Sequence, residues 1–149
     1  MPARKTKDQK LIVTSSSLLN ELVVYLQLAQ AFKERLQMPD RDRALVLAGA
    51  AASLLNLEPI SNFCRALILN NNAGHMVRRW DSFRAALQDD DFHVFLKQLA
   101  RRFPTEVGES ILRDLGFHND VRRSDYESEM DYVAAIMGVD AQWIEDNFS

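Results

Sequence analysis

The residues best suited to binding an anion lie between Asn70 and Arg79. The stretch Asn70-Asn71-Asn72-Ala73-Gly74 is followed by His75, Arg78 and Arg79. Asparagine and glycine tolerate left-handed backbone, so the stretch is typical of a loop. A loop that enters a helix exposes backbone amides, and two arginines add positive charge beside them. We therefore consider an anion or small-ligand site at the His75 loop, although it lacks the fixed glycine and lysine spacing of phosphate-binding loops.

The other reactive residue types form no pattern that supports catalysis or metal binding. No two of His75, His93 and His118 are spaced three to five residues apart, as metal ligands on one helix would be. Cys64, the single cysteine, shares an apolar helical stripe with Ile60 and Leu67, where a thiol is buried and unreactive. The Gly-x-Ser-x-Gly motif is also absent. The sequence thus predicts a non-enzymatic protein without metal or cofactor.

A second basic region spans the helices predicted to start at His75 and at Asp89. Its cations are Arg78, Arg79, Arg84, Lys97, Arg101 and Arg102, interleaved with Trp80, Phe83, Phe92 and Phe95. Arginines among aromatic residues are typical of protein interfaces. The aromatic spacing is that of an inner helical stripe, however, so we assign these rings to the core. The exposed candidates for an interaction surface or anion site are His75, Arg78, Arg79, Arg101 and Arg102.

Charge is unevenly distributed along the chain. The net charge is −3, but residues 104–149 carry three Lys or Arg against eleven Asp or Glu. This acidic last third is a potential partner for a basic surface, either within the chain, through residues 120–146, or on another molecule. A weakly basic body with an acidic end does not favour dedicated nucleic-acid binding.

The segment from Ala134 to Ile144 resembles a helix-turn-helix. Ala134, Gly138, Val139 and Ile144 match the small, turn and buried positions of that motif. The resemblance implies DNA recognition by the second helix. That helix offers Asp140, Glu145 and Asp146, and there is no Lys or Arg from Ser124 to Ser149. Phosphate contacts need cations, so we expect two packed helices without a recognition role.

Helical periodicity and capping residues predict an all-α bundle of seven or eight mostly short helices. The first helix is expected to start at Ser15–Ser17 and to end at Pro39, and a second, rich in small residues, to run from Asp40 or Asp42 to about Leu55. Glu58-Pro59 is expected to open a third. Further helices are expected from about His75 to Leu87, from Asp89–Asp91 to Pro104, and from Thr105 to Gly116. Ser124 and Glu127 predict a capping box for the next helix, closed by Gly138, and Asp140 caps the last.

The length and composition fit one domain with its own core. The chain has 149 residues, 47% of them hydrophobic and 26% charged, close to globular averages. We expect a flexible basic tail over residues 1–14 and one helical domain over residues 15–149. The longest run of small or apolar residues, Ala44–Leu55, is too short to cross a membrane. With one cysteine and no signal-peptide pattern, the expected location is the cytoplasm.

These observations favour a regulatory or adaptor protein that acts through protein–protein contacts, including self-association. The alternatives are nucleic-acid binding by the basic tail and the arginines between His75 and Arg102, and anion or small-ligand binding at the His75 loop. The sequence does not identify the partner or the oligomeric state.

Overall fold

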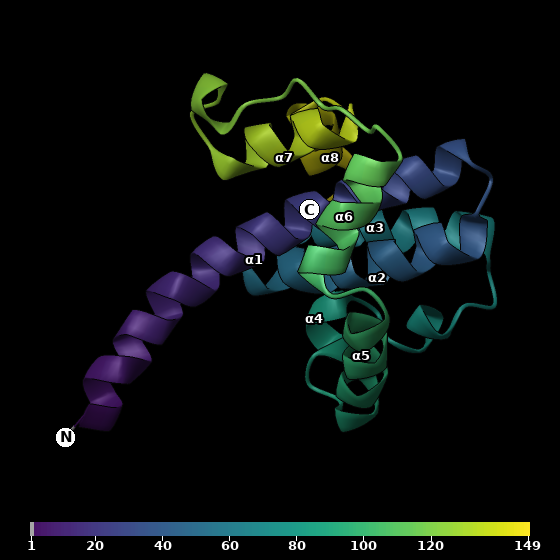
Figure 1. Ribbon diagram of the computed structural model, residues 1–149. Helices are drawn as coiled ribbons and strands as arrows, with labels where there is room; N and C mark the ends of the chain where they lie inside the picture. The colour runs from purple at the N-terminus through teal and green to yellow at the C-terminus, as the bar shows by residue number, and fades with distance from the viewer. Residues whose placement is uncertain (1) are drawn as a thin grey trace.

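The computed structural model describes the backbone of residues 2–149 and the side chains of residues 16–149. The described residues form eight α-helices and two short 3-10 helices, without a strand (Figure 1). In chain order these are α1 (Pro2–Glu34), α2 (Met38–Leu54), α3 (Glu58–Asn71), η1 (Met76–Arg79), α4 (Phe83–Ala86), α5 (Asp90–Arg102), α6 (Thr105–Asp114), η2 (Arg123–Asp125), α7 (Glu129–Met137) and α8 (Ala141–Phe148). The predicted all-α fold is confirmed. The expected flexible tail over residues 1–14 lies outside the fully described residues.

The small-residue helix α2 lies at the centre of the molecule. It packs against α1 on one side and α3 on the other, and α4 and α5 also contact it. Every residue from Ala44 to Ser53 is buried. The small side chains allow close approach: a Cβ at Gly49 would lie 2.2 Å from Cε2 of Phe83. The small residues of α2 thus place it in contact with several other helices.

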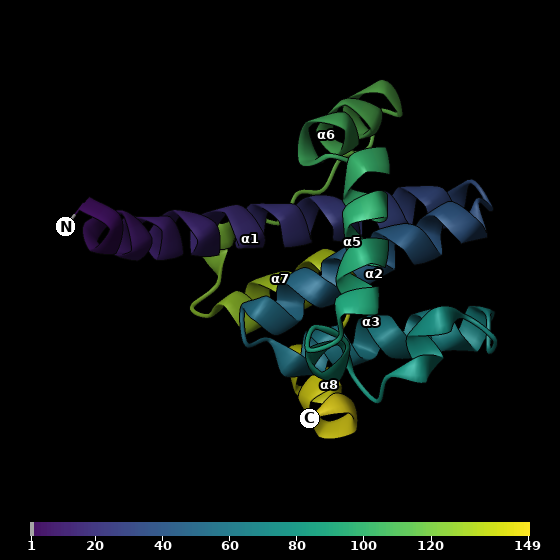
Figure 2. The same ribbon diagram turned by 90° about the horizontal axis from the view of Figure 1, so that it is seen from below.

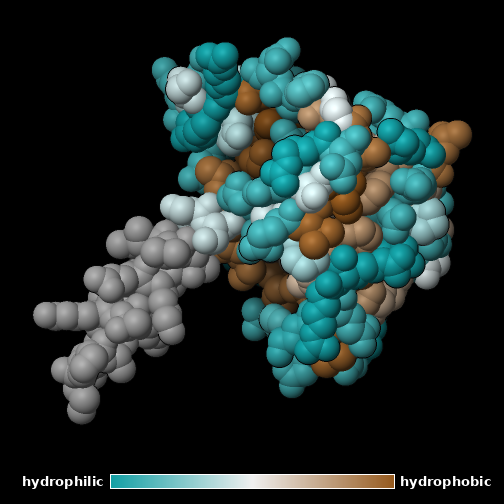
Figure 3. Space-filling view, viewed as in Figure 1, coloured by the Kyte–Doolittle hydropathy of each residue, from teal (hydrophilic) through white to brown (hydrophobic). Residues whose placement is uncertain are grey.

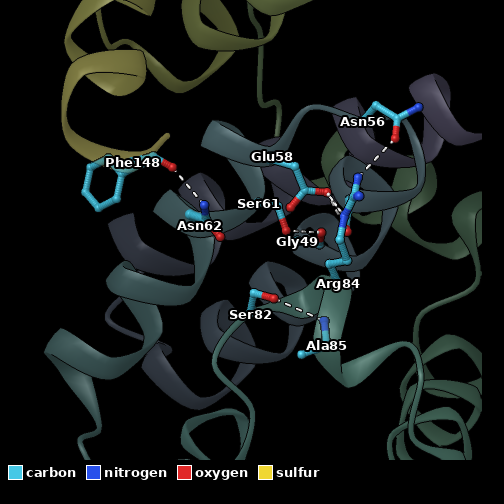
Figure 4. Close-up of polar contacts among 10 residues, drawn as sticks. Gly49, Asn56, Glu58, Ser61, Asn62, Ser82, Arg84, Ala85 and Phe148 are labelled. Carbon is cyan, nitrogen blue, oxygen red and sulfur yellow. Dashed lines mark hydrogen bonds and ion pairs between the residues drawn. The ribbon is translucent and has the colours of Figure 1, made fainter.

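Side-chain hydrogen bonds connect α3 to the central helix α2, and connect α4 and α8 to α3 (Figure 4). The Ser61 hydroxyl of α3 donates to the Gly49 carbonyl of α2 at 2.8 Å. Asn62 Nδ2 donates to the Phe148 carbonyl at 2.7 Å and so ties α8 to α3. Arg84 of α4 donates to Glu58 Oε1 at 3.0 Å, which ties α4 to the start of α3.

The boundary between α1 and α2 differs from the prediction. Pro39 lies in the first turn of α2 and does not terminate the preceding helix, which ends at Glu34. Leu36 adopts a left-handed conformation, with φ of 59°, and reverses the chain between the two helices. Proline suits the first turn of a helix because its missing amide has no intrahelical partner there. The start of α3 at Glu58-Pro59 follows the same logic and was predicted correctly.

The single helix expected from His75 to Leu87 is divided in two. Trp80 has extended backbone and separates η1 from α4. Ser82 then caps α4, because its hydroxyl accepts a hydrogen bond from the Ala85 amide at 3.0 Å. Trp80 and Phe83 are nevertheless buried as their spacing predicted. The pattern therefore identified the burial correctly and the continuity of the helix wrongly.

The start of α7 also differs from the prediction. Ser124 lies in η2, and the capping serine is Ser128, whose hydroxyl accepts from the Asp131 amide at 3.0 Å. The predicted helix start at Asp89–Asp91 is confirmed, with Asp89 as the cap, and so is the predicted cap at Asp140. Gly116 and Gly138 close α6 and α7 with φ of 63° and 71°, as expected of helix-ending glycines.

The acidic C-terminal helices and the helix α5, which carries Lys97, Arg101 and Arg102, lie on opposite sides of the central helices. Figure 1 shows α7 and α8 above α1–α3, and α4 and α5 below them. In Figure 2, seen from below, α5 lies in front of α2. Figure 3 shows hydrophobic residues mostly in the crevices between elements, whereas the surface at the α5 end is largely hydrophilic.

Candidate functional site

Most backbone amides of the His75 loop donate hydrogen bonds to acceptors within the loop itself. The Gly74 and His75 amides donate to Asn72 at 3.2 and 3.0 Å. The Val77 amide donates to His75 Nδ1 at 3.1 Å, and the Arg78 amide donates to the His75 carbonyl at 3.1 Å. Few donors therefore remain for an anion, and the two arginines would have to supply most of the contacts.

The His75 ring is half-buried and favours its neutral form. It lies in a hollow of about 320 Å³ between the start of α2, the end of α3 and α5, with its ring centroid 6.4 Å from that of Phe95. Burial lowers the pKa of His75, although the Asp42 carboxylate opposes this effect. Because Nδ1 accepts the Val77 amide, the neutral ring carries its proton on Nε2.

Arg78 and Arg79 have different surroundings. Arg79 Nη2 lies 3.3 Å from Asp89 and 3.0 Å from Asp91, and its guanidinium is 5.0 Å from the centroid of the Trp80 ring. The Trp80 indole donates to Asp89 at 3.0 Å, and this hydrogen bond lowers the pKa of that carboxyl. Arg79 is thus balanced by local acids. Arg78 is exposed and its one side-chain hydrogen bond is to the Ala73 carbonyl at 3.4 Å.

Arg101 and Arg102 lie at the other end of α5. That helix has 13 residues, so its ends are about 20 Å apart. Arg101 is exposed and forms no ion pair among the described residues. Arg102 Nη2 lies 3.9 Å from Asp40, and its guanidinium is 5.7 Å from the Phe103 ring centroid. The five predicted site residues therefore form two separate groups. Together with Lys97, Arg101 and Arg102 form what we call the α5 basic stripe.

The acidic C-terminal helices present their carboxylates to solvent. Between Ser124 and Ser149 there are seven Asp or Glu and no Lys or Arg. None of these carboxylates forms an ion pair with a cation in the described part of the chain; the ion pairs there involve only residues 40–102. We call the surface formed by Asp131, Asp140, Glu145 and Asp146 the acidic C-terminal surface.

The segment that resembles a helix-turn-helix forms two helices, α7 and α8, joined at Gly138. α8 packs against α3, and Ile144 is fully buried in this contact. Glu145, Asp146 and Asn147 face solvent. Trp143 is 46% exposed, with its ring edge against Phe63 at a centroid distance of 5.6 Å.

A pocket that the sequence did not predict lies between α1, α2, α3 and α7. It holds about 170 Å³ and is lined by Leu26, Ala29, Gln30, Lys33, Arg41, Leu45, Phe63, Leu67, Met137 and Val139. Arg41 is only 6% exposed, which is rare for arginine. The sequence held one sign of this burial: Arg41 lies four residues before Leu45 and so shares the buried face of α2. However, an arginine beside three other charged residues is typical of a solvated helix start.

The remaining reactive groups behave as expected of core or isolated residues. Cys64 is fully buried, as predicted, and burial raises the pKa of its thiol to about 12, although Arg41 partly counteracts this effect. His93 Nε2 lies 2.6 Å from the Leu87 carbonyl and so holds the proton there. Among the described residues, no three His, Cys, Asp or Glu side chains gather as metal ligands would.

Comparison with known proteins identifies no relative of this chain. Within the described residues, no helix combines the length and apolar character needed to span a bilayer. No protein-family model, curated protein or solved structure matches the chain.

Proposed function

We propose that this chain is a non-enzymatic interaction protein that binds an acidic protein surface through the α5 basic stripe. In its simplest form the acidic surface belongs to a second copy, namely the acidic C-terminal surface. The proposal includes a cytoplasmic location, supported by the single cysteine, which is buried and reduced.

One observation carries the proposal: the two oppositely charged surfaces do not neutralise each other within one molecule. α5 and the pair α7–α8 lie on opposite sides of α1–α3 (Figure 1). No ion pair joins residues 124–149 to any described cation. The proposal therefore requires that the acidic C-terminal surface of one molecule attract the α5 basic stripe of another. It does not rest on the pairing within one chain that was considered from the sequence.

The placement of the two surfaces defines the type of assembly. When complementary patches lie on opposite sides, one copy binds the next head to tail. Such contacts produce a ring or an open chain, and the average size grows with protein concentration. Because the pairs are solvent-exposed, salt at about 0.15 M already screens them beyond about 8 Å. The association should therefore be weak and strongly dependent on ionic strength.

Sedimentation velocity at low and high salt tests this proposal. We expect concentration-dependent association at about 20 mM salt and a monomer at about 500 mM, since the Debye length falls several-fold between them. The double variant Lys97→Glu/Arg101→Glu should remain monomeric at low salt. A matched double variant with the same charge change, Arg35→Glu/Arg113→Glu, should associate like the wild type.

A charge swap decides whether the two named surfaces meet. Glu145→Lys/Asp146→Lys should also be monomeric at low salt. A mixture of this variant with Lys97→Glu/Arg101→Glu should associate head to tail in alternating order, although neither variant associates alone, because each surface of one variant then meets a surface of opposite charge on the other. A wild-type monomer at every salt concentration, or an absence of rescue in the mixture, would contradict self-association through these surfaces.

An electrophoretic mobility shift with single-stranded RNA and duplex DNA tests the nucleic-acid alternative. We expect no shift at about 0.1 M salt, because only three cations form the stripe and binding to phosphates grows with the number of cations that contact them. A shift abolished by Lys97→Glu/Arg101→Glu would replace the protein partner by a nucleic acid at the same surface.

A further inference from the structure

We propose that the pocket between α1, α2, α3 and α7 binds a small organic monocarboxylate with an apolar body, whose carboxylate is received by Arg41. This inference is independent of the interaction function proposed above, because the pocket and the α5 basic stripe share no residue.

The guanidinium of Arg41 has unused donors directed at accessible space. Its Nη1 donates to Asp42 Oδ1 and to the Leu67 carbonyl, both at 3.2 Å. Its Nε and Nη2 have no acceptor among the described residues. No buried side-chain nitrogen or oxygen there lacks a partner, so these two nitrogens are in contact with accessible space. Since Arg41 lines the pocket, its interior is where an acceptor would reach them.

The geometry of a guanidinium suits a carboxylate. Nε and Nη2 form one edge of the planar group, and two parallel N–H donors on that edge match the two oxygens of a carboxylate. Asp42 occupies Nη1 from outside the lining, and Asn71 Nδ2 also donates to Asp42, at 2.8 Å. The ion pair with Asp42 thus fixes the guanidinium in place without filling the edge that faces the pocket.

The walls of the pocket require that the rest of the ligand be apolar. Leu26, Leu45 and Leu67 contribute aliphatic surface, and Phe63 contributes an aromatic ring. A dry cavity of about 150 Å³ holds a molecule the size of benzene. The 170 Å³ available here therefore suits a body of about six carbon atoms. Inorganic phosphate would leave these walls unoccupied.

The charge around the pocket favours a single negative charge. Lys33 and Arg41 are the charged lining residues, and no carboxylate lines the pocket. Because Asp42 compensates part of the Arg41 charge, the site carries roughly one uncompensated positive charge, supplied by Lys33 at the exposed end of α1. Gln30 donates to the Ile136 carbonyl at 2.7 Å, which orients that wall and joins α1 to α7.

The test is an amide-resolved NMR titration of the full-length chain with sodium hexanoate, 1-hexanol and sodium acetate at matched ionic strength. Hexanoate should cause saturable shifts that centre on the lining residues of α1, α2, α3 and α7. Its affinity should exceed that of hexanol at least tenfold, since hexanol lacks the carboxylate. Acetate should also bind at least tenfold more weakly than hexanoate, since it lacks the apolar body.

Four variants, one of them a control, separate this site from a purely structural arginine. Ala29→Leu fills the pocket from α1 and should abolish hexanoate binding while the circular dichroism spectrum stays unchanged. Lys33→Gln should weaken hexanoate binding about threefold without changing that of hexanol. Arg35→Gln, an exposed neighbour that does not line the pocket, should change neither. In Arg41→Gln, hexanoate should lose its advantage over hexanol.

Ala29→Leu and Lys33→Gln still test the carboxylate site in this pocket if Arg41→Gln fails to fold. Equal affinities for hexanoate and hexanol in the wild type would overturn the assignment of a carboxylate ligand. Hexanoate binding that survives Ala29→Leu, or an absence of saturable shifts at the lining residues, would overturn the site itself.

Discussion

Helices α2 and α5 both have an acidic residue in the first turn and both carry arginines, yet they are buried to very different extents. In α2, twelve of the seventeen residues are buried, including Arg41 and Asp42. In α5, only Phe92 and Leu99 are buried among thirteen residues. Arg41 in α2 is therefore held in place by Asp42 and the Leu67 carbonyl, and only the pocket is open to the rest of its guanidinium. Arg101 in α5 is exposed along its side chain and is free to meet another macromolecule. Burial, more than residue type, thus determines how large a partner each arginine can meet.

Asp42→Ala should have the largest effect, because it removes the partner of a buried cation in α2. Asp42 accepts from Arg41 at 3.2 Å and from Asn71 at 2.8 Å. Loss of one member of a buried ion pair costs about 3 kcal/mol or more. Urea denaturation should show this loss in the free energy of unfolding. Asp40→Ala, two residues earlier and partly exposed, should cost less than about 1 kcal/mol. Equal effects would mean that Arg41 is better solvated than its burial indicates.

Gly49→Ala should destabilise the protein by about 2 kcal/mol, because there is no room for a methyl group on α2 at this position. The added Cβ would lie 2.2 Å from the ring of Phe83, which is itself buried against Phe92. Thermal denaturation should show a lower melting temperature. Gly74→Ala, where the nearest atom is 3.7 Å away, should change the stability by less than about 0.5 kcal/mol. A tolerated Gly49→Ala would contradict the close contact between α2 and α4.

The same substitution in the two helices sharpens the comparison further. Val46→Ala in α2 removes a fully buried side chain and should cost about 2 kcal/mol. Val94→Ala in α5 removes a side chain that is 59% exposed and should change the stability by less than about 0.5 kcal/mol. Chemical denaturation of both variants under one set of conditions measures the difference. A costly Val94→Ala would indicate that α5 is covered, for example by self-association.

The smallest expected effect concerns His75, which lies between the start of α2 and α5. Burial lowers its pKa below the ordinary value of 6.5, so the unfolded chain binds more protons than the folded chain in mildly acidic solution. Stability should therefore fall as the pH drops below about 6.5. In His75→Asn, whose side-chain oxygen can still accept the Val77 amide, this decline between about pH 7 and pH 5 should be smaller by less than about 1 kcal/mol. An unchanged pH profile would mean that His75 is fully solvated.

Helix ends that depend on the chemistry of neighbouring residues could be predicted from the sequence. Several such ends were predicted correctly: the start of α5 within Asp89–Asp91, the cap at Asp140, the closing glycines Gly116 and Gly138, and the start of α3 at Glu58-Pro59. The break at Trp80 was not, because helical spacing of aromatic residues records burial and not backbone continuity. Likewise, the cap of α7 was predicted at Ser124, but it is Ser128, four residues later, whose hydroxyl accepts from the Asp131 amide.

The candidate sites depended more on tertiary structure than the helices did. Arg78 and Arg79 of η1 and Arg101 and Arg102 of α5 appeared in the sequence as one basic region, because spacing along the chain does not show which cations have local acidic partners. Arg79 is balanced by Asp89 and Asp91, and Arg101 is not. The pocket at Arg41 is formed by four helices, so no local pattern could define it.

The two tryptophans make the two ends of the molecule optically distinguishable. Trp80 is 7% exposed beside the start of α5 and donates to Asp89, whereas Trp143 is 46% exposed on α8 and touches Phe63, a wall of the Arg41 pocket. A Trp80→Phe variant would leave an emission that reports on α8 and the pocket alone. The reciprocal Trp143→Phe variant would report on the α5 end, so events at either end can be followed in solution without an added label.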